Sequence, residues 1–156
     1  MVGETELVAT LKEKGLTVAT AESLTAGMLS ATIVKVPGAS AVFRCGFVTY
    51  ASETKTSLLG VPAELIEKNG VVSAEVAKAM AEGACRNGGS DVGISTTGNA
   101  GPDVLEFKPV GRVYTGICIN GVTTVTEHTF SGDRESIRRQ TTNAAIRECA
   151  VRLSEM

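Results

Sequence analysis

The strongest constraint on the fold is a predicted β-hairpin centred near residue 120. Two segments, 110–119 and 122–129, alternate between apolar and polar residues in the way of strands with one buried face. Asn120 and Gly121 lie between them, and this dipeptide favours a two-residue hairpin turn because both residues tolerate a positive φ. We therefore expect an antiparallel pair in the sheet that this chain forms.

The rest of the chain alternates short strand-like segments with helical ones. Strands are expected at 16–20 and 91–95, with another that ends at Tyr50 and begins at either 41 or 46. Helices are expected at 4–14, 28–36, 52–59, 62–68, 74–86 and from residue 131 onward. This mixture predicts an α/β fold, a single three-layer α/β/α domain with a mixed sheet that includes the hairpin. The chain has 156 residues, enough for one domain with a substantial core, so one domain over 1–156 is expected.

Composition argues against several classes of function. The net charge is −2 and Trp is absent, which disfavours nucleic-acid binding. No apolar run approaches the length of a membrane span, and the charged N-terminus has no signal-peptide core, so no membrane partner is expected. The four cysteines are not paired in a CxxC motif and resemble the buried thiols of a reducing compartment. We therefore expect a cytoplasmic protein.

A lysine-activated hydroxyl is the chemistry that the segment 37–55 suggests. The chain has a single histidine, His128, so neither a Ser/His pair nor a histidine-based metal site is favoured. Ser40 follows a Pro-Gly turn, Tyr50 ends an apolar run, and Lys55 comes five residues later. A lysine serves as a base only if burial or a neighbouring cation lowers its pKa. The structural alternatives are a turn serine, a half-buried tyrosine and a solvated lysine.

Geometry limits this pairing of Ser40 with Lys55. If 41–50 were one straight strand, Ser40 and Tyr50 would lie about 30 Å apart. Either a turn or short helix covers 40–45 and the strand begins at Gly46, or the site is shared between two subunits. The sequence leaves both arrangements open.

Two strand-end loops carry hydroxyls and glycines. The first, AESLTAG at 21–27, contains Ser23 and Thr25 before a helix, and the second, TTGNAGP at 96–102, contains Thr97 and Gly98. Free N–H groups at such a helix start favour an anion, and glycine lets backbone approach a ligand closely. The hydroxyls of the first loop could equally be helix caps.

A third polar feature is the cluster of arginines at the start of the last helix, which includes Arg134, Arg138 and Arg139. Cations near a helix N-terminus are unfavourable unless an acid or an anion neutralises them. The cluster is therefore interpreted either as pairing with Asp133 or Glu135, or as a phosphate clamp.

Several segments together resemble one family, the C-terminal domain of the competence/damage-inducible CinA proteins, which also occurs alone as nicotinamide-nucleotide amidohydrolase. They occur in order from about residue 5 to 153 and read AESLTAG, PGAS, GFVTY with Lys55, LGV, GVVS, TGNAGP, KPVG and FSGDR. The resemblance implies a single CinA C-terminal-like amidohydrolase domain. It also implies hydrolysis of the carboxamide of nicotinamide mononucleotide to nicotinate mononucleotide and ammonia, without a metal or other cofactor.

The same resemblance implies roles for individual residues. Ser40 matches the nucleophile, Lys55 its general base and Tyr50 the neighbouring hydroxyl. Substrate-binding positions are expected at Ser23, Thr25, Thr97, Gly98 and Arg134. The expected partner is thus a small-molecule nucleotide, and an exposed hairpin edge could also pair two copies into a homo-oligomer.

Two segments depart from the family pattern. The usual AESCTGG reads AESLTAG here, with Leu24 and Ala26 at the changed positions, and 103–107 reads DVLEF in place of a glycine run. These departures motivate an alternative function, a nucleotide-binding or regulatory module linked to competence or DNA damage that has lost turnover. A different amide substrate is a third hypothesis.

Overall fold

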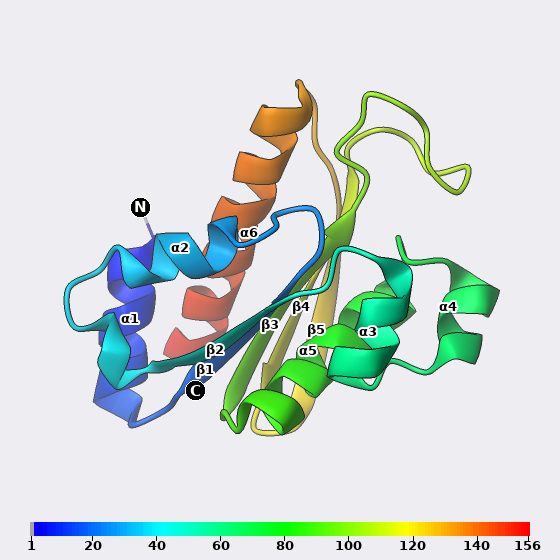
Figure 1. The fold of residues 1–156 in the computed structure, drawn as a ribbon. Coiled ribbons are helices and arrows are strands. Elements are labelled where there is room, and N and C mark those ends of the chain that lie inside the picture. The colour runs from blue at the N-terminus through cyan, green and yellow to red at the C-terminus, as the bar shows by residue number, and fades with distance from the viewer. Residues whose placement is uncertain (1) are drawn as a thin grey trace.

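The protein is described here from a computed structural model, which covers residues 2–156. A five-stranded sheet runs through the molecule in the order β2-β1-β3-β4-β5 (Figure 1). Its strands are β1 (Val18–Glu22), β2 (Phe43–Val48), β3 (Val92–Gly98), β4 (Arg112–Ile119) and β5 (Val122–Thr129). β1 pairs in parallel with both β2 and β3, whereas β4 and β5 extend the sheet antiparallel. The predicted mixed sheet is confirmed.

Helices cover both faces of the sheet, which gives the predicted three layers (Figure 1). On one face lie α1 (Glu4–Lys14), α2 (Met28–Val34) and α6 (Arg134–Ser154). On the other lie α3 (Ser52–Leu59), α4 (Ala63–Asn69) and α5 (Ala74–Gly88). Because both faces are covered, every residue of β1 is buried, and the core divides into an α1–α2–α6 side around Leu11 and Ile94 and an α5 side around Met80.

The hairpin forms as the sequence predicts. Ile119 pairs with Val122, and the two turn residues Asn120 and Gly121 have φ values of 48° and 85°. Positive φ at both central positions is the backbone of a type I′ turn, whose twist matches that of the flanking strands. The local signal therefore sets the register of β4 against β5.

The segment before Tyr50 is neither one straight strand over 41–50 nor a turn over 40–45 followed by a strand from Gly46. A 3-10 turn covers Ala39–Ala41, and β2 then starts at Phe43, three residues before Gly46. Gly46 lies inside β2, at a position where a side chain would collide with its neighbours. A Cβ atom there would lie 2.6 Å from Ser30 Oγ and 2.9 Å from Thr20 Oγ1. Gly46 thus permits close packing of β2 and does not begin it.

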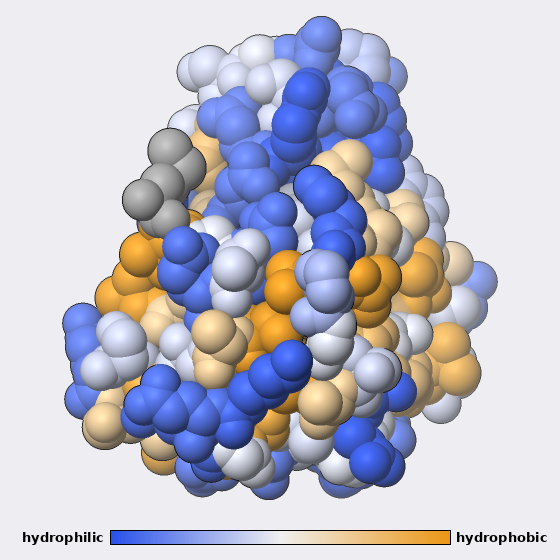
Figure 2. Space-filling model, turned by 90° about the vertical axis from the view of Figure 1, so that its left-hand side faces the viewer, coloured by the Kyte–Doolittle hydropathy of each residue, from blue (hydrophilic) through white to orange (hydrophobic). Residues whose placement is uncertain are grey.

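The surface on the α1–α2 side is unevenly polar. Figure 2 shows hydrophilic residues gathered over its upper part, where α6 begins, and smaller hydrophobic areas below. Within residues 2–156, no helix combines the length and apolar character that a membrane span requires.

Candidate active site

A cavity of about 260 Å³ opens at the end of the sheet where the parallel strands finish. Its wall includes Ser23, which follows β1, Tyr50, which follows β2, and Thr97, at the end of β3. In a sheet of this kind, ligands bind outside the carboxyl ends of the parallel strands, where loops from different strands converge. The topology therefore brings three separate strand ends to one site.

Lys55 lies behind Ser23, outside the residues that line the cavity, and is fully buried, with 0% of its surface exposed. Its Nζ donates to Ser23 Oγ at 3.0 Å and to the Thr49 carbonyl oxygen at 2.6 Å. Burial disfavours the charged amine and lowers the pKa of Lys55 from 10.5 to about 8, although the negative charge of Glu106 acts in the opposite direction. An amine with a pKa of about 8 is neutral in a minority of molecules near pH 7 and in most of them above pH 8, and here it has a serine hydroxyl as its neighbour.

The turn that carries Ser23 is organised by the preceding residue, Glu22. This buried carboxylate accepts hydrogen bonds from Thr25 Oγ1 and from the backbone N–H groups of Gly27, Leu29 and Ser30 at 2.7 to 3.1 Å, and from Ser30 Oγ at 2.6 Å. It thereby caps the start of α2, where backbone donors have no helical acceptor. The turn after β1 is held firmly, and Ser23 with it.

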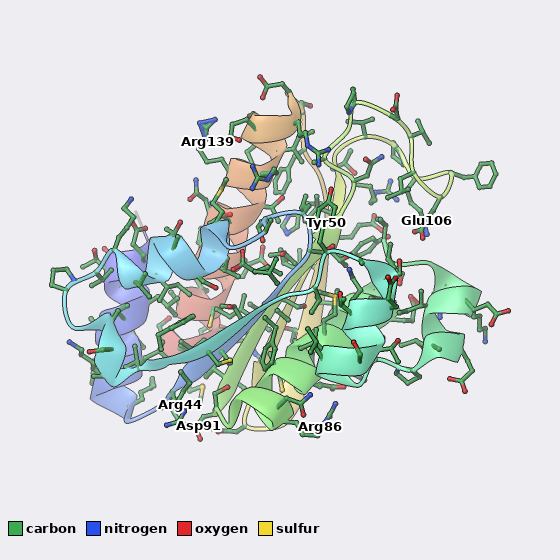
Figure 3. The ribbon with its side chains drawn as sticks, viewed as in Figure 1. Arg44, Tyr50, Arg86, Asp91, Glu106 and Arg139 are labelled. Atoms are coloured by element: carbon green, nitrogen blue, oxygen red, sulfur yellow. The ribbon has the colours of Figure 1, made fainter. Side chains whose placement is uncertain are left out.

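Ser40 does not take part in this arrangement. It lies in the exposed 3-10 turn before β2, whereas Lys55 follows β2, so the six residues of the strand, roughly 20 Å, separate them within one chain. Figure 3 shows the course of this strand, with Arg44 near its start at one end of the sheet and Tyr50 beyond its end at the other. The expected contact of Ser40 with Lys55 is corrected to a contact of Ser23 with Lys55. Within one chain Lys55 is enclosed, and its Nζ donates to Ser23 and to the Thr49 carbonyl oxygen and not to Ser40.

Tyr50 and Arg134 meet at the rim of the cavity. Arg134, the first residue of α6, donates from Nη2 to Tyr50 Oη at 2.9 Å and from Nη1 to the Gly101 carbonyl oxygen. Tyr50 remains 58% exposed, so its hydroxyl lies at the mouth and not beside the buried amine. The guanidinium is thus held at the mouth of the site.

The other predicted binding residues divide into two groups. Thr97 and Gly98 line the cavity, with Thr97 Oγ1 donating to the Val71 carbonyl oxygen at 2.7 Å. Thr25 is buried beneath it, where its hydroxyl donates to Glu22 and bonds to Thr96 Oγ1 at 2.8 Å. Thr25 therefore braces the turn. It is not the helix cap that the sequence also allowed, because Gly27 is the N-cap of α2 and that cap has no side-chain hydrogen bond.

The two altered family positions also differ in their surroundings. Leu24 is buried, lines the cavity and packs with Ala100, Val113 and Ile137. Ala26 is exposed and is not part of the cavity wall, and its backbone has a φ of 45°. The methyl group of Ala26 therefore leaves the approach of a ligand free, whereas Leu24 shapes the wall.

Glu106 is a residue of the site that the sequence analysis did not predict. It lies in the segment 103–107, which differs from the family pattern. Its carboxylate accepts from the backbone N–H groups of Val71 at 2.9 Å and Val72 at 3.0 Å, and Lys108 Nζ lies 3.7 Å away. Glu106 reaches the cavity wall from this loop, at the same end of the sheet as Tyr50 (Figure 3). No signal local to 103–107 indicates this contact, because its partners lie more than thirty residues earlier in the chain.

Across residues 2–156, no group of three or more His, Cys, Asp or Glu side chains is placed to hold a metal ion. Cys45, Cys85, Cys118 and Cys149 are free thiols.

Comparison with known proteins places these features in a family. The family model described as the CinA C-terminal domain matches residues 3–153. A competence-damage inducible protein from Alkaliphilus oremlandii is 52% identical over 137 residues, which is 87% of this chain and 33% of the relative. One from Clostridium acetobutylicum is 47% identical over 150 residues, 93% of this chain and 36% of the relative. The chain thus spans about a third of the length of these relatives.

Solved structures share the whole fold. The crystal structure of a competence-damaged protein (CinA) superfamily protein from Klebsiella pneumoniae has a TM-score of 0.95 at 28% identity, covering 98% of this chain and 96% of that one. The competence/damage inducible protein CihA from Agrobacterium tumefaciens has a TM-score of 0.90 at 33% identity, covering 97% of this chain and 96% of that one.

Proposed function

Because this chain belongs to the CinA C-terminal domain family, we propose that it hydrolyses the carboxamide of nicotinamide mononucleotide, with Ser23 as the nucleophile and Lys55 as the general base. The observation that carries the proposal is the buried contact of 3.0 Å between Lys55 Nζ and Ser23 Oγ, beside a cavity. A lysine with a lowered pKa next to a hydroxyl is a recognised way to activate a nucleophile without histidine.

The reaction follows from these two side chains. Neutral Lys55 accepts the Ser23 hydroxyl proton through its Nζ lone pair while Oγ attacks the carboxamide carbon. The resulting ammonium gives its proton to the departing nitrogen, so ammonia leaves and an ester to Ser23 remains. Water then attacks this ester, with Lys55 again taking a proton and returning one to Ser23 Oγ. Backbone N–H groups of the strand-end loops, such as that of Leu24, are suited to stabilise the oxyanion.

Recognition of the nucleotide is assigned to the mouth of the site. Arg134 presents a guanidinium at the first turn of a 21-residue helix, whose N-terminus also favours negative charge. Both features support binding of the substrate phosphate there, with Tyr50 orienting the guanidinium through its hydroxyl. In this assignment Tyr50 acts through Arg134, and the proton transfers are left to Lys55.

Ammonia release from nicotinamide mononucleotide, measured without added metal, tests the proposal. Ser23→Ala and Lys55→Met are each expected to reduce turnover by at least about a hundredfold, because each removes a group of one catalytic unit. Ser40→Ala is the matched control and is expected to retain the wild-type rate, since Ser40 is exposed at the far end of β2. Loss of activity in Ser40→Ala with retention in Ser23→Ala would reverse the assignment.

A second candidate is a nucleotide-binding module without turnover, linked to competence or DNA damage. The names of the relatives from Alkaliphilus and Clostridium favour it, since they describe induction and not catalysis. Calorimetric binding of nicotinamide mononucleotide with no ammonia release by the wild-type protein would select this candidate.

A further inference from the structure

We infer that Glu106 is a specificity residue that selects ligands with a cationic ring, such as a pyridinium, over otherwise identical ligands with an uncharged ring. The inference deepens the proposed function and rests on it for the identity of the substrate. It concerns a residue of the segment 103–107, where this chain reads DVLEF.

The charges at the cavity wall carry the first step. Among the described residues that line the cavity, Glu106 is the one acid and Arg134 the one base. They are held by separate elements, Glu106 by the backbone of 71–72 and Arg134 by Tyr50 and the Gly101 carbonyl. A wall with one charge of each sign complements a ligand that carries both signs. A nucleotide with a cationic base and a phosphate is such a ligand.

The second step is that the carboxylate is fixed before any ligand arrives. It bonds to two successive backbone N–H groups, those of Val71 and Val72. Gly70 leaves room for it, since a Cβ atom at that position would lie 2.5 Å from Glu106 Oε1. The side chain nevertheless remains 28% exposed, so the charge is not enclosed. A fixed, partly solvated carboxylate attracts a nearby cation without a large cost of desolvation.

The third step separates this role from simple bracing of the loop. Bracing needs only an oxygen that accepts from Val71 and Val72, whereas selection of a cation needs the negative charge. Lys108 offers a matched control, because it braces the same loop by donating to the Asn69 carbonyl oxygen at 3.2 Å and lies 3.7 Å from Glu106. Removing the Lys108 ammonium loosens the loop, because its hydrogen bond to Asn69 is lost. It also removes the positive charge beside Glu106, so the negative charge of Glu106 acts more strongly on a ligand. The two variants therefore move cation preference in opposite directions.

The test compares two ligands that differ in ring charge, nicotinamide mononucleotide and its dihydro form, which has a neutral ring and the same phosphate and carboxamide. Dissociation constants are measured by calorimetry in the 156-residue chain carrying Ser23→Ala, so that no hydrolysis occurs, alone and combined with Glu106→Gln or Lys108→Gln. In the Ser23→Ala parent, the oxidised form is expected to bind more tightly, on the order of tenfold, as Coulomb attraction at a partly exposed site allows. Glu106→Gln should remove most of this preference, and Lys108→Gln should keep or increase it.

An unchanged ratio in Glu106→Gln would overturn the inference, as would an equal loss in Lys108→Gln or failure of the parent to bind either nucleotide. Loss of preference in Glu106→Gln supports it even when both affinities fall, since loosening of the loop weakens both ligands alike. The proposed function fails separately. If wild-type protein releases no ammonia but the ratio changes as expected, cation selection stands and the amidase assignment does not.

Discussion

Glu22→Gln is the substitution that tests most directly how the turn carrying Ser23 is held. The buried carboxylate has five donors, with Thr25 Oγ1, Gly27 N and Leu29 N on Oε1, and Ser30 N and Oγ on Oε2. Glutamine keeps the shape of the side chain but replaces one of the two acceptor oxygens with an NH₂ group.

The magnitude follows from what each donor can do afterwards. The amide oxygen can serve the three donors at Oε1, and the Ser30 hydroxyl can turn to accept from the NH₂ group, but the Ser30 backbone N–H then faces another donor. One buried unpaired N–H costs about 1–3 kcal/mol, and the remaining bonds each lose about 1 kcal/mol of charge assistance. Relief from burying a charge offsets several kcal/mol of this. We expect a net loss of about 2–3 kcal/mol in the free energy of unfolding.

Urea unfolding followed by far-UV circular dichroism measures this loss, with Glu13→Gln as the matched control. Glu13 is an exposed residue of α1, where the same change should cost under about 0.5 kcal/mol. Ammonia release should fall in Glu22→Gln as well, because Ser23 follows directly on the loosened residue. A stability loss below about 1 kcal/mol would show that the five bonds do not hold the turn, which would refute the reasoning.

Three further predictions concern Lys55 and Ala26. kcat/KM should rise with pH and level off above about 8, because the pKa of Lys55 is lowered to about 8 by burial and only the neutral amine is a base; a profile flat from about pH 6 to 9 would contradict this role. The pKa of Lys55 is about 8 in the folded protein against 10.5 for a free side chain, so the unfolded chain binds more protons between these values. The free energy of unfolding of the wild type, relative to that of Lys55→Met, should therefore rise by on the order of 3 kcal/mol as the pH increases across that window. Urea unfolding at several pH values measures this difference, and a difference that stays constant or falls with pH would contradict the prediction. Ala26→Gly should raise the free energy of unfolding by up to about 1 kcal/mol and leave turnover unchanged, since Ala26 has a φ of 45° and lies outside the cavity wall; a loss of stability on urea unfolding would argue against backbone strain there.

The parts of the fold that sequence predicts well are those with local signals. The hairpin is specified by alternation and by Asn120-Gly121, and the expected helix 4–14 matches α1 because apolar spacing and Gly15 mark its face and its end. The strand over 91–95 is longer in the structure, where β3 continues to Gly98. Its last residues are hydroxyl-rich, and pairing with β4 overrides their weak apolar character.

The serine that contacts Lys55 could not be identified by spacing along the chain. Ser40 is close to Lys55 in sequence but lies at the wrong end of β2, whereas Ser23 is distant in sequence and follows β1, the strand beside β2. The relevant signal was present, since polar residues followed both predicted strands and the carboxyl ends of parallel strands share one edge. This signal places Ser23 near Lys55 only once it is known that β1 and β2 are parallel neighbours, and no local sequence pattern indicates that pairing. Glu106 was missed for a related reason, because its contacts with 71–72 join distant segments.

The buried side chains of Glu22 and Lys55 differ in how well hydrogen bonds stabilise their charged forms. Adjacent residues at a strand end point to opposite faces, so Glu22 turns toward α2 and Ser23 turns toward Lys55. The Glu22 carboxylate accepts hydrogen bonds from five protein donors. A Lys55 ammonium has three N–H donors, and among the described residues only the Ser23 hydroxyl and the Thr49 carbonyl accept from it. A carboxylate paired with Lys55 would have kept the amine charged. By directing the Glu22 carboxylate to the helix start, the fold leaves the lysine able to lose its proton beside the serine.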